Sequence, residues 1–168
     1  MTTLALDASS TITGYSVFVD GKYTMSGFID LKKYHDSEYR LYEMSKQICD
    51  VISCYKPDKI ILEDTYSSPN ISTLKVLANL SGAIKFYCYL HQIPVEMIMP
   101  SAWRKYLKIQ EKGAKRNELK NKALVVCQDQ LNMPFIEIDE AEAICINLSA
   151  AVRDGLFVLK EQSDDNIW

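Results

Sequence analysis

The sequence predicts an α/β fold with a mixed five-stranded sheet flanked by helices, and three observations support this prediction. Three strand-like segments come first, and Asp20-Gly21 between the second and third is a strong hairpin signal. Continuous apolar runs at 59–64 and 94–99 are typical of strands buried on both faces of a parallel sheet. Segments with apolar residues at helical spacing separate these runs. We therefore expect three antiparallel strands followed by two parallel ones.

The expected elements follow from turn and capping signals along the chain. Strands are expected at 2–7, at 14–19, from the hairpin to about residue 31, at 59–64 and at 94–99. Asp36 or Ser37 can cap the first helix, which ends before Pro57. Further helices are expected at 72–91, just after residue 100, up to about 130 and at 139–152. This order, βββ-α-β-α-β-α-α-α, is characteristic of the ribonuclease H-like architecture.

Length and composition indicate one globular domain. The chain has 168 residues, of which 48% are hydrophobic, so a core can form without disulfides or structural metals. We expect the domain to span residues 1–155 and a polar C-terminal tail to span 156–168. No apolar run reaches the roughly 18 residues of a membrane span, and the start of the sequence leads us to expect no signal peptide. Five cysteines without a Cys-x-x-Cys pair argue against zinc and favour a cytoplasmic protein with reduced thiols.

The charges are unevenly distributed. The whole chain carries a net charge of -3, but the segment 101–122 carries eight basic residues against Glu111 and Glu118 and is therefore +6. The eight are Arg104, Lys105, Lys108, Lys112, Lys115, Arg116, Lys120 and Lys122. Such asymmetry indicates either a phosphate-facing surface on an acidic body or a solvated helix face. Lys120 and Lys122 are also interpretable as solubility charges.

Carboxylates end two of the apolar strands. Asp7 closes the first strand and Glu63 lies at the end of the fourth. A carboxylate at such a position is costly unless it is paired or bound to a cation. If the two strands are adjacent and parallel, both acids reach the same edge of the sheet, where open α/β sheets place their sites.

Asp139 and Glu142 add two acids at the start of the last helix. Their i, i+3 spacing places them on one helix face, whereas Glu140 is turned away by about 100° and is expected to be solvated. Asp139 alone could also be a helix N-cap. Four hard oxygen donors favour Mg²⁺, with Mn²⁺ as a substitute. Two such ions about 3.5–4 Å apart would favour in-line phosphodiester hydrolysis.

The sequence resembles the RuvC family of Holliday junction resolvases over roughly residues 3–151. The resemblance rests on Leu-Ala-Leu-Asp7 followed by Thr13-Gly14-Tyr15, Ile-Ile-Leu-Glu63-Asp-Thr-Tyr66, Leu80-Ser-Gly82, Pro100 before Arg104-Lys105, and Asp139-Glu-Ala-Glu142-Ala. Each segment alone is weak, but all of them in this order are specific.

The resemblance implies a homodimeric, Mg²⁺-dependent nuclease domain that nicks two strands of a four-way DNA junction symmetrically. The implied catalytic and metal-binding residues are Asp7, Glu63, Asp139 and Glu142. The implied DNA contacts are Tyr66, which would stack on bases near the crossover, and Arg104, Lys105, Lys115 and Arg116.

Some positions depart from the family pattern. Ala8-Ser9-Ser10 stand where Pro-Gly usually follows the first acid, and Glu142 replaces the usual final Asp. These differences resemble the phage-encoded branch of the family, which would act in the cytoplasm of a bacterial host. We therefore also expect forks and other branched DNA to be accepted as substrates.

Three alternatives remain open on the sequence alone. The segment from Asp7 to Gly14 also resembles the first phosphate loop of actin, Hsp70 and sugar kinases, although those proteins need a second domain and glycine-rich contacts to the nucleotide. A ribonuclease acting on RNA–DNA hybrids would use the same fold and metals. A DNA-binding module with a vestigial site is the non-enzymatic alternative.

Overall fold

The structure, a computed structural model, describes residues 1–64, 70–133 and 136–160. Its strands form a five-stranded sheet in the order β3-β2-β1-β4-β5. The strands are β1 (Thr2–Asp7), β2 (Ile12–Val19), β3 (Lys22–Asp30), β4 (Lys59–Glu63) and β5 (Val95–Ile98). The first three pair antiparallel, whereas β4 pairs parallel with both β1 and β5. The predicted mixed sheet is confirmed.

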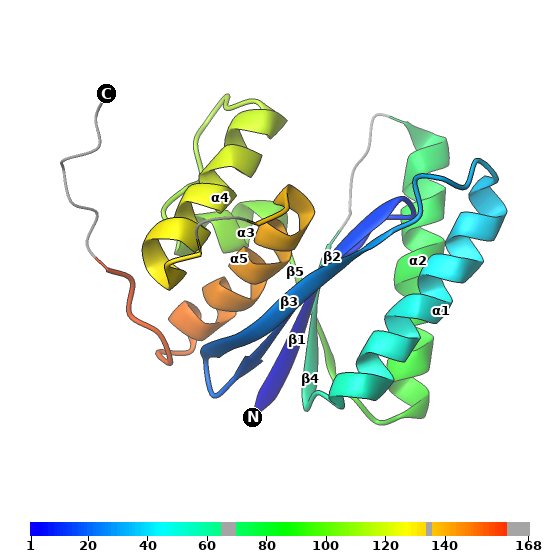
Figure 1. Cartoon of the computed structure of the whole chain (residues 1–168), viewed down its shortest axis with the longest axis horizontal. Helices are drawn as coiled ribbons and strands as arrows, with labels where there is room; N and C mark the ends of the chain where they lie inside the picture. The colour runs from blue at the N-terminus through cyan, green and yellow to red at the C-terminus, as the bar shows by residue number, and fades with distance from the viewer. Residues whose placement is uncertain (65–69, 134–135, 161–168) are drawn as a thin grey trace.

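Helices cover both faces of this sheet (Figure 1). The helices are α1 (Ser37–Tyr55), α2 (Ile71–Leu90), α3 (Pro100–Tyr106), α4 (Arg116–Leu131) and α5 (Ile138–Arg153). One face, here the α1–α2 face, packs against α1 and α2. The other, here the α5 face, packs against α5, and α3 and α4 in turn contact α5.

Local chemistry explains where the elements begin and turn. Asp20 and Gly21 both have positive φ, 49° and 76°, which matches the backbone of a tight hairpin between β2 and β3. Asp36 caps α1, because its carboxylate accepts a hydrogen bond from the Tyr39 backbone N–H at 2.7 Å. Strand β2 begins at residue 12, two residues before the predicted start, because Ile12 still pairs with Asp30.

Alternation along the strands divides the core in two. Leu4 and Leu6 of β1 belong to the core on the α1–α2 face, and Ala5 between them belongs to the core on the α5 face. In β4, Ile61 likewise belongs to the α5-face core. Asp7 and Glu63, two residues after Ala5 and Ile61, therefore share the α5 side of the sheet.

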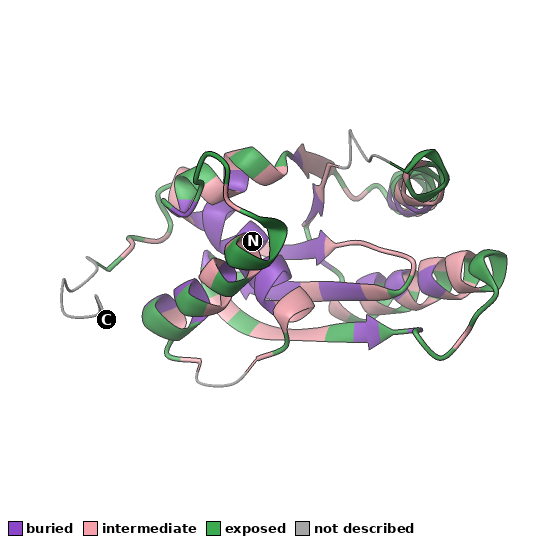
Figure 2. Cartoon of the chain, turned by 90° about the horizontal axis from the view of Figure 1, so that it is seen from above, coloured by how far each residue is buried: buried purple, intermediate pink, exposed green. Residues whose placement is uncertain are grey.

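Helix α5 is buried on all sides in its central part. Every residue from 141 to 151 is buried, between the sheet and the helices α3 and α4. Figure 2 shows that buried residues concentrate in the strands and on inward helix faces, while exposed ones lie outside. A helix enclosed in this way is fixed in position, so the acids at its N-terminal end have a rigid support.

The C-terminal end of the described chain is packed rather than free. Phe157 and Leu159 contact the α5-face core, and the Lys160 backbone N–H donates to Gln130 Oε1 at 2.7 Å. The packed chain thus continues to residue 160, beyond the boundary expected at 155; residues 161–168 lie outside the described part. Among the helices described, none combines the length and apolarity that a membrane crossing needs.

Candidate active site

Two adjacent parallel strands place the first two acids at one edge of the sheet. Leu6 of β1 lies beside Leu62 of β4, and Asp7 and Glu63 are the next residues of these strands. Both side chains line a pocket of about 590 Å³, here the acidic pocket, together with Asp139 and Glu142 of α5. The structure therefore brings together the four acids that the sequence singled out.

A glycine allows α5 to approach the sheet at this point. Gly14 of β2 lies opposite Asp7 in the β1–β2 register. A Cβ atom added to Gly14 would lie 1.9 Å from the backbone oxygen of Asp139, far inside van der Waals contact. No side chain larger than hydrogen fits there, so Gly14 sets the distance between the start of α5 and the end of β1.

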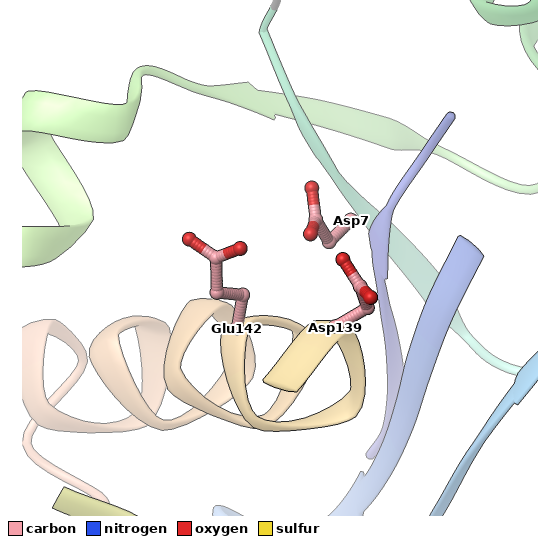
Figure 3. Close-up of side chains that lie close together, drawn as sticks. All are labelled: Asp7, Asp139 and Glu142. Atoms are coloured by element: carbon pink, nitrogen blue, oxygen red, sulfur yellow. The ribbon is translucent and has the colours of Figure 1, made fainter. Parts of the chain in front are cut away.

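Three of the four carboxylates form a tight group. One oxygen each of Asp7, Asp139 and Glu142 lies within 4.8 Å of the others. Figure 3 shows the Asp7 carboxylate between the sheet edge and α5, with Asp139 and Glu142 one helical turn apart on the side of α5 that faces it. Glu142 is 5% exposed. Carboxylate oxygens from two rigid elements are a donor set that fits a hard divalent cation.

Glu63 lines the same pocket but is held by a different partner. Its Oε1 accepts a 2.7 Å hydrogen bond from the indole Nε1–H of Trp103, which is fully buried on α3. The bond orients the Glu63 carboxylate within the lining of the acidic pocket. Glu63 thus has a fixed position in the lining of the acidic pocket, next to the three-carboxylate group.

Two basic side chains form ion pairs with acids of the acidic pocket. Lys120 of α4 places Nζ 3.0 Å from Asp139 Oδ1 and 2.9 Å from Glu142 Oε2. Arg104 of α3 places one terminal nitrogen 3.3 Å from Glu142 Oε1 and stacks on the Trp103 ring at 4.6 Å. Each oxygen of the buried Glu142 carboxylate is therefore matched by one cation.

The electrostatics of the site follow from burial and crowding. Burial raises the pKa of Asp7 well above its usual range, and the charges of Glu63 and Glu142 raise it further. Burial also raises the pKa of Glu63, against the lowering effect of the Trp103 hydrogen bond. For Lys120, burial alone would lower the pKa, but the hydrogen bonds and charges of Glu142 and Asp139 raise it overall. The pocket thus favours an added positive charge.

The predicted DNA contacts occupy different places. Arg116, the first residue of α4, lines the acidic pocket, while Lys115 caps that helix and Lys105 on α3 is exposed. Arg104 is not a free surface cation, because it is 15% exposed and paired with Glu142. Tyr66 lies outside the described residues.

Sequence reasoning missed three features of the site. Trp103 was not singled out, although a tryptophan just after a strand needs a partner for its N–H when buried. Lys120 was interpretable as a solubility charge, yet it is an ion-pair partner of two site acids. The expectation of a solvated Glu140 is wrong, because Ser26 of β3 donates a 2.5 Å hydrogen bond to Glu140 Oε1.

The sequence of this chain is similar to those of known proteins. The model of the family described as crossover junction endodeoxyribonuclease RuvC matches residues 3–149. RuvC of Wigglesworthia glossinidia brevipalpis is 30% identical over 152 residues, covering 87% of this chain and 90% of that relative. RuvC of Nitratidesulfovibrio vulgaris (strain DP4) is 27% identical over 110 residues; the match spans 64% of this chain and only 66% of that relative's length.

A solved structure shares the fold. T. thermophilus RuvC in complex with a Holliday junction substrate superimposes with a TM-score of 0.72 at 16% sequence identity, covering 95% of this chain and 98% of that one. The likeness confirms the predicted ribonuclease H-like fold class.

Proposed function

The chain belongs to the RuvC family of crossover junction endodeoxyribonucleases, and we propose that it is a divalent-metal-dependent endonuclease that nicks four-way DNA junctions. The observation that carries this proposal is the meeting of Asp7, Asp139 and Glu142 within 4.8 Å, with Glu63 in the same pocket. Metal-dependent hydrolysis of phosphodiesters uses such a set of hard ligands and needs no protein nucleophile.

The residues of the pocket have separable roles in this proposal. Asp7, Asp139 and Glu142 would hold divalent cations, Mg²⁺ with Mn²⁺ as substitute, and Glu63 would add a ligand at a position set by Trp103. Bound cations supply the charge that activates water and stabilises the leaving oxygen in an in-line displacement. The rigid sheet edge and the enclosed helix α5 keep the backbone that carries the ligands in place.

A basic rim beside the pocket supports binding of the DNA backbone. Arg116 lies at the pocket and at the N-terminus of α4, where a helix also favours anions, and Lys115 and Lys105 extend the positive charge outward. Arg104 would approach a strand at the pocket itself. Tyr66, three residues after Glu63, remains the proposed base-stacking residue.

An exposed stripe on α2 supports a homodimer. Ile71, Ala78, Phe86 and Tyr89 recur on one side of the helix, and Tyr89 is 78% exposed. Gly82, in the middle of the stripe, has nothing within 4 Å of an added Cβ, so a second copy of α2 could approach closely. Two copies of the pocket would then nick two strands of one junction.

The departures at Ala8-Ser9-Ser10 and at Glu142 support a phage-encoded type of the family, acting in the cytoplasm of a bacterial host on four-way junctions and also on forks. This breadth of substrate is part of the proposal and distinguishes it from a strict junction resolvase.

A nicking assay tests the proposal. Synthetic four-way junctions, forks, linear duplex and an RNA–DNA hybrid are compared in Mg²⁺ and in Mn²⁺. We expect paired nicks in the junction, weaker cleavage of forks, and no cleavage of the linear duplex. Preferential cleavage of the hybrid would instead identify a ribonuclease H-type enzyme.

Variants connect that activity to the pocket. Asp7→Asn and Glu63→Gln should abolish cleavage but retain junction binding in Ca²⁺, because each removes one ligand charge and leaves the basic rim intact. Asp50→Asn, which alters an exposed acid paired with Lys46 on α1, is the matched control and should cut at the wild-type rate. Near wild-type cleavage by Asp7→Asn would overturn the assignment.

A further inference from the structure

Lys120 is a basic residue that pairs with two acids of the acidic pocket. It lies on α4, and its side chain is only 15% exposed. Its ammonium bridges Asp139 Oδ1 and Glu142 Oε2, at 3.0 and 2.9 Å. These two acids sit one turn apart on α5, so one cation from the neighbouring helix holds both of them.

The bridge uses oxygen atoms that a metal would need. Glu142 has two carboxylate oxygens, of which Arg104 faces one and Lys120 the other. Asp7 and Glu63, by contrast, form no ion pair with any basic residue in the described part of the chain; Glu63 receives only the neutral Trp103 N–H. The charges of the Asp139–Glu142 pair are therefore already neutralised, whereas Asp7 and Glu63 are still open to a cation.

Charge balance leads to the same division. With Lys120 included, three basic side chains (Arg104, Arg116 and Lys120) face five carboxylates (Asp7, Glu63, Asp64, Asp139 and Glu142) at the pocket. This leaves a charge of about -2 when all the acids are ionised, and one divalent ion balances it. The pocket is then neutral, and a second divalent ion would bring it to about +2 unless a basic group left. Lysine has a flexible stem and a mobile charge, whereas Arg104 is stacked on Trp103, so Lys120 is the group that can leave.

We propose that Lys120 is a built-in counter-cation of the Asp139–Glu142 pair, so that the free protein binds one divalent ion readily and a second only by displacing the ammonium. This inference rests on the proposed function, because it takes the acidic pocket as the metal site. It adds that the second ion position is controlled by a residue of the chain itself. Lys120 is thus a positioning residue for the metal site, acting through Asp139 and Glu142.

A Mn²⁺ titration of the full chain without DNA tests the inference, with free Mn²⁺ measured by electron paramagnetic resonance. For the wild type we expect one ion bound, and a second at least about tenfold more weakly, within the usual range of coupling between sites. In Lys120→Met the affinity for the second ion should rise about tenfold and approach the affinity for the first ion. Lys120→Arg keeps the charge and should behave like the wild type.

Lys122→Met is the matched control. It removes the same charge from the same helix, two residues away, but Lys122 pairs with Glu111 and not with a pocket acid. Its Mn²⁺ titration should coincide with that of the wild type. An equal rise in affinity for the Lys122 and Lys120 variants would show that only long-range charge matters and would overturn the inference.

Thermal unfolding gives a second readout that keeps the test valid if Lys120→Met is destabilised. In EDTA this variant should unfold at a lower temperature than the wild type, because Glu142 keeps only Arg104 as a partner. Saturating Mn²⁺ should then raise its unfolding temperature by more than it raises that of the wild type, because the ion takes over the role of the ammonium. An equal or smaller increase would contradict the inference.

The outcomes separate this inference from the proposed function. If the wild type and Lys120→Met bind two ions with the same affinities, the role of Lys120 is refuted and the metal site stands. If Asp7→Asn binds as many ions as the wild type, the acidic pocket is not the metal site, and both proposals fail.

Discussion

The two faces of the sheet are made by the same strands but differ in how they hold their helices. On the α1–α2 face, β1 presents Leu4 and Leu6 to the large aliphatic side chains of α1 and α2. On the α5 face, the same strand presents Thr3, Ala5 and Asp7, which are small or polar. The first face is held by apolar volume, whereas the second combines packing with specific polar contacts.

Asn147 of α5 shows what the second kind of contact achieves. Its side chain is 1% exposed; Oδ1 accepts from Thr3 Oγ1 at 2.6 Å, and Nδ2 donates to the Thr3 and Ser16 carbonyl oxygens. Ser16 Oγ in turn donates to the Ala143 carbonyl at 2.8 Å. These directional bonds fix the position of α5 along β1 and β2, and the helix carries two of the four site acids. The α5 face therefore fixes the position of its helix through directional bonds, whereas the α1–α2 face holds its helices through apolar packing.

The largest effect is expected from Gly14→Ala, which breaks the close approach on the α5 face. The new methyl would overlap the Asp139 backbone, so the start of α5 must move. We expect a loss of about 3 kcal/mol in the free energy of unfolding. Junction cleavage should fall about 100-fold, because a displacement near 1 Å is enough to misplace catalytic ligands. Urea unfolding and nicking rates measure the two effects.

Gly27→Ala is the control on the same sheet. Its added Cβ would meet the side chain of Tyr15, at 2.6 Å from the hydroxyl oxygen, and no backbone atom is among its three nearest contacts. A side chain can rotate away, so cleavage should stay within about threefold of the wild type after a modest loss of stability. If both glycine variants lost cleavage equally, the special role of the α5 face would be refuted.

The sequence could predict the parts of this arrangement that depend on order along the chain. The strands, the parity that places Asp7 and Glu63 on one side, and the i, i+3 spacing of Asp139 and Glu142 are all periodic features, and the structure agrees with them. Contacts between different helices and strands do not follow such a periodic pattern, so the sequence pattern does not predict them. Lys120 reaches α5 because of how α4 packs, and Trp103 reaches Glu63 across 40 residues of sequence.

The same limit explains the error at Glu140. Helical geometry correctly turns Glu140 away from the Asp139–Glu142 side, but it cannot say what lies in the new direction. There β3 supplies Ser26, whose hydroxyl donates to the carboxylate and is itself within 2.9 Å of the Tyr23 hydroxyl. Glu140 is turned away from the metal-site acids and forms a hydrogen bond with another strand.

Substitution of one buried residue on each side of the sheet should affect the two faces differently. Asn147→Leu should lower the free energy of unfolding by about 3 kcal/mol, because the Thr3 and Ser16 groups lose buried hydrogen bonds. Ile48→Val, which trims a fully buried side chain of α1, should cost about 1 kcal/mol. Chemical denaturation measures both values.

Metal affinity separates the two variants further. Asn147→Leu should also weaken Mn²⁺ binding, since the helix that carries Asp139 and Glu142 loses its directional anchor. Ile48→Val should leave Mn²⁺ binding unchanged. If the isoleucine variant weakened metal binding as much as the asparagine variant did, the two faces would not differ in function.

The smallest effect on stability is expected at the rim, where the comparison extends to the basic residues of the α5 side. Lys120 and Arg104 are half-buried and paired with acids, whereas Lys115 is exposed and forms no ion pair with a described residue. Its charge is thus available to a DNA phosphate.

Lys115→Ala should leave the unfolding free energy within about 0.5 kcal/mol of the wild type. The salt dependence of junction binding in Ca²⁺ should become shallower by about one unit of log K against log salt, as the loss of one phosphate contact requires. Lys46→Ala on α1, remote from the pocket and paired with Asp50, controls for net charge and should not change that slope. An unchanged slope for Lys115→Ala would place this lysine among the solvated charges and confine DNA binding to the pocket side of α4.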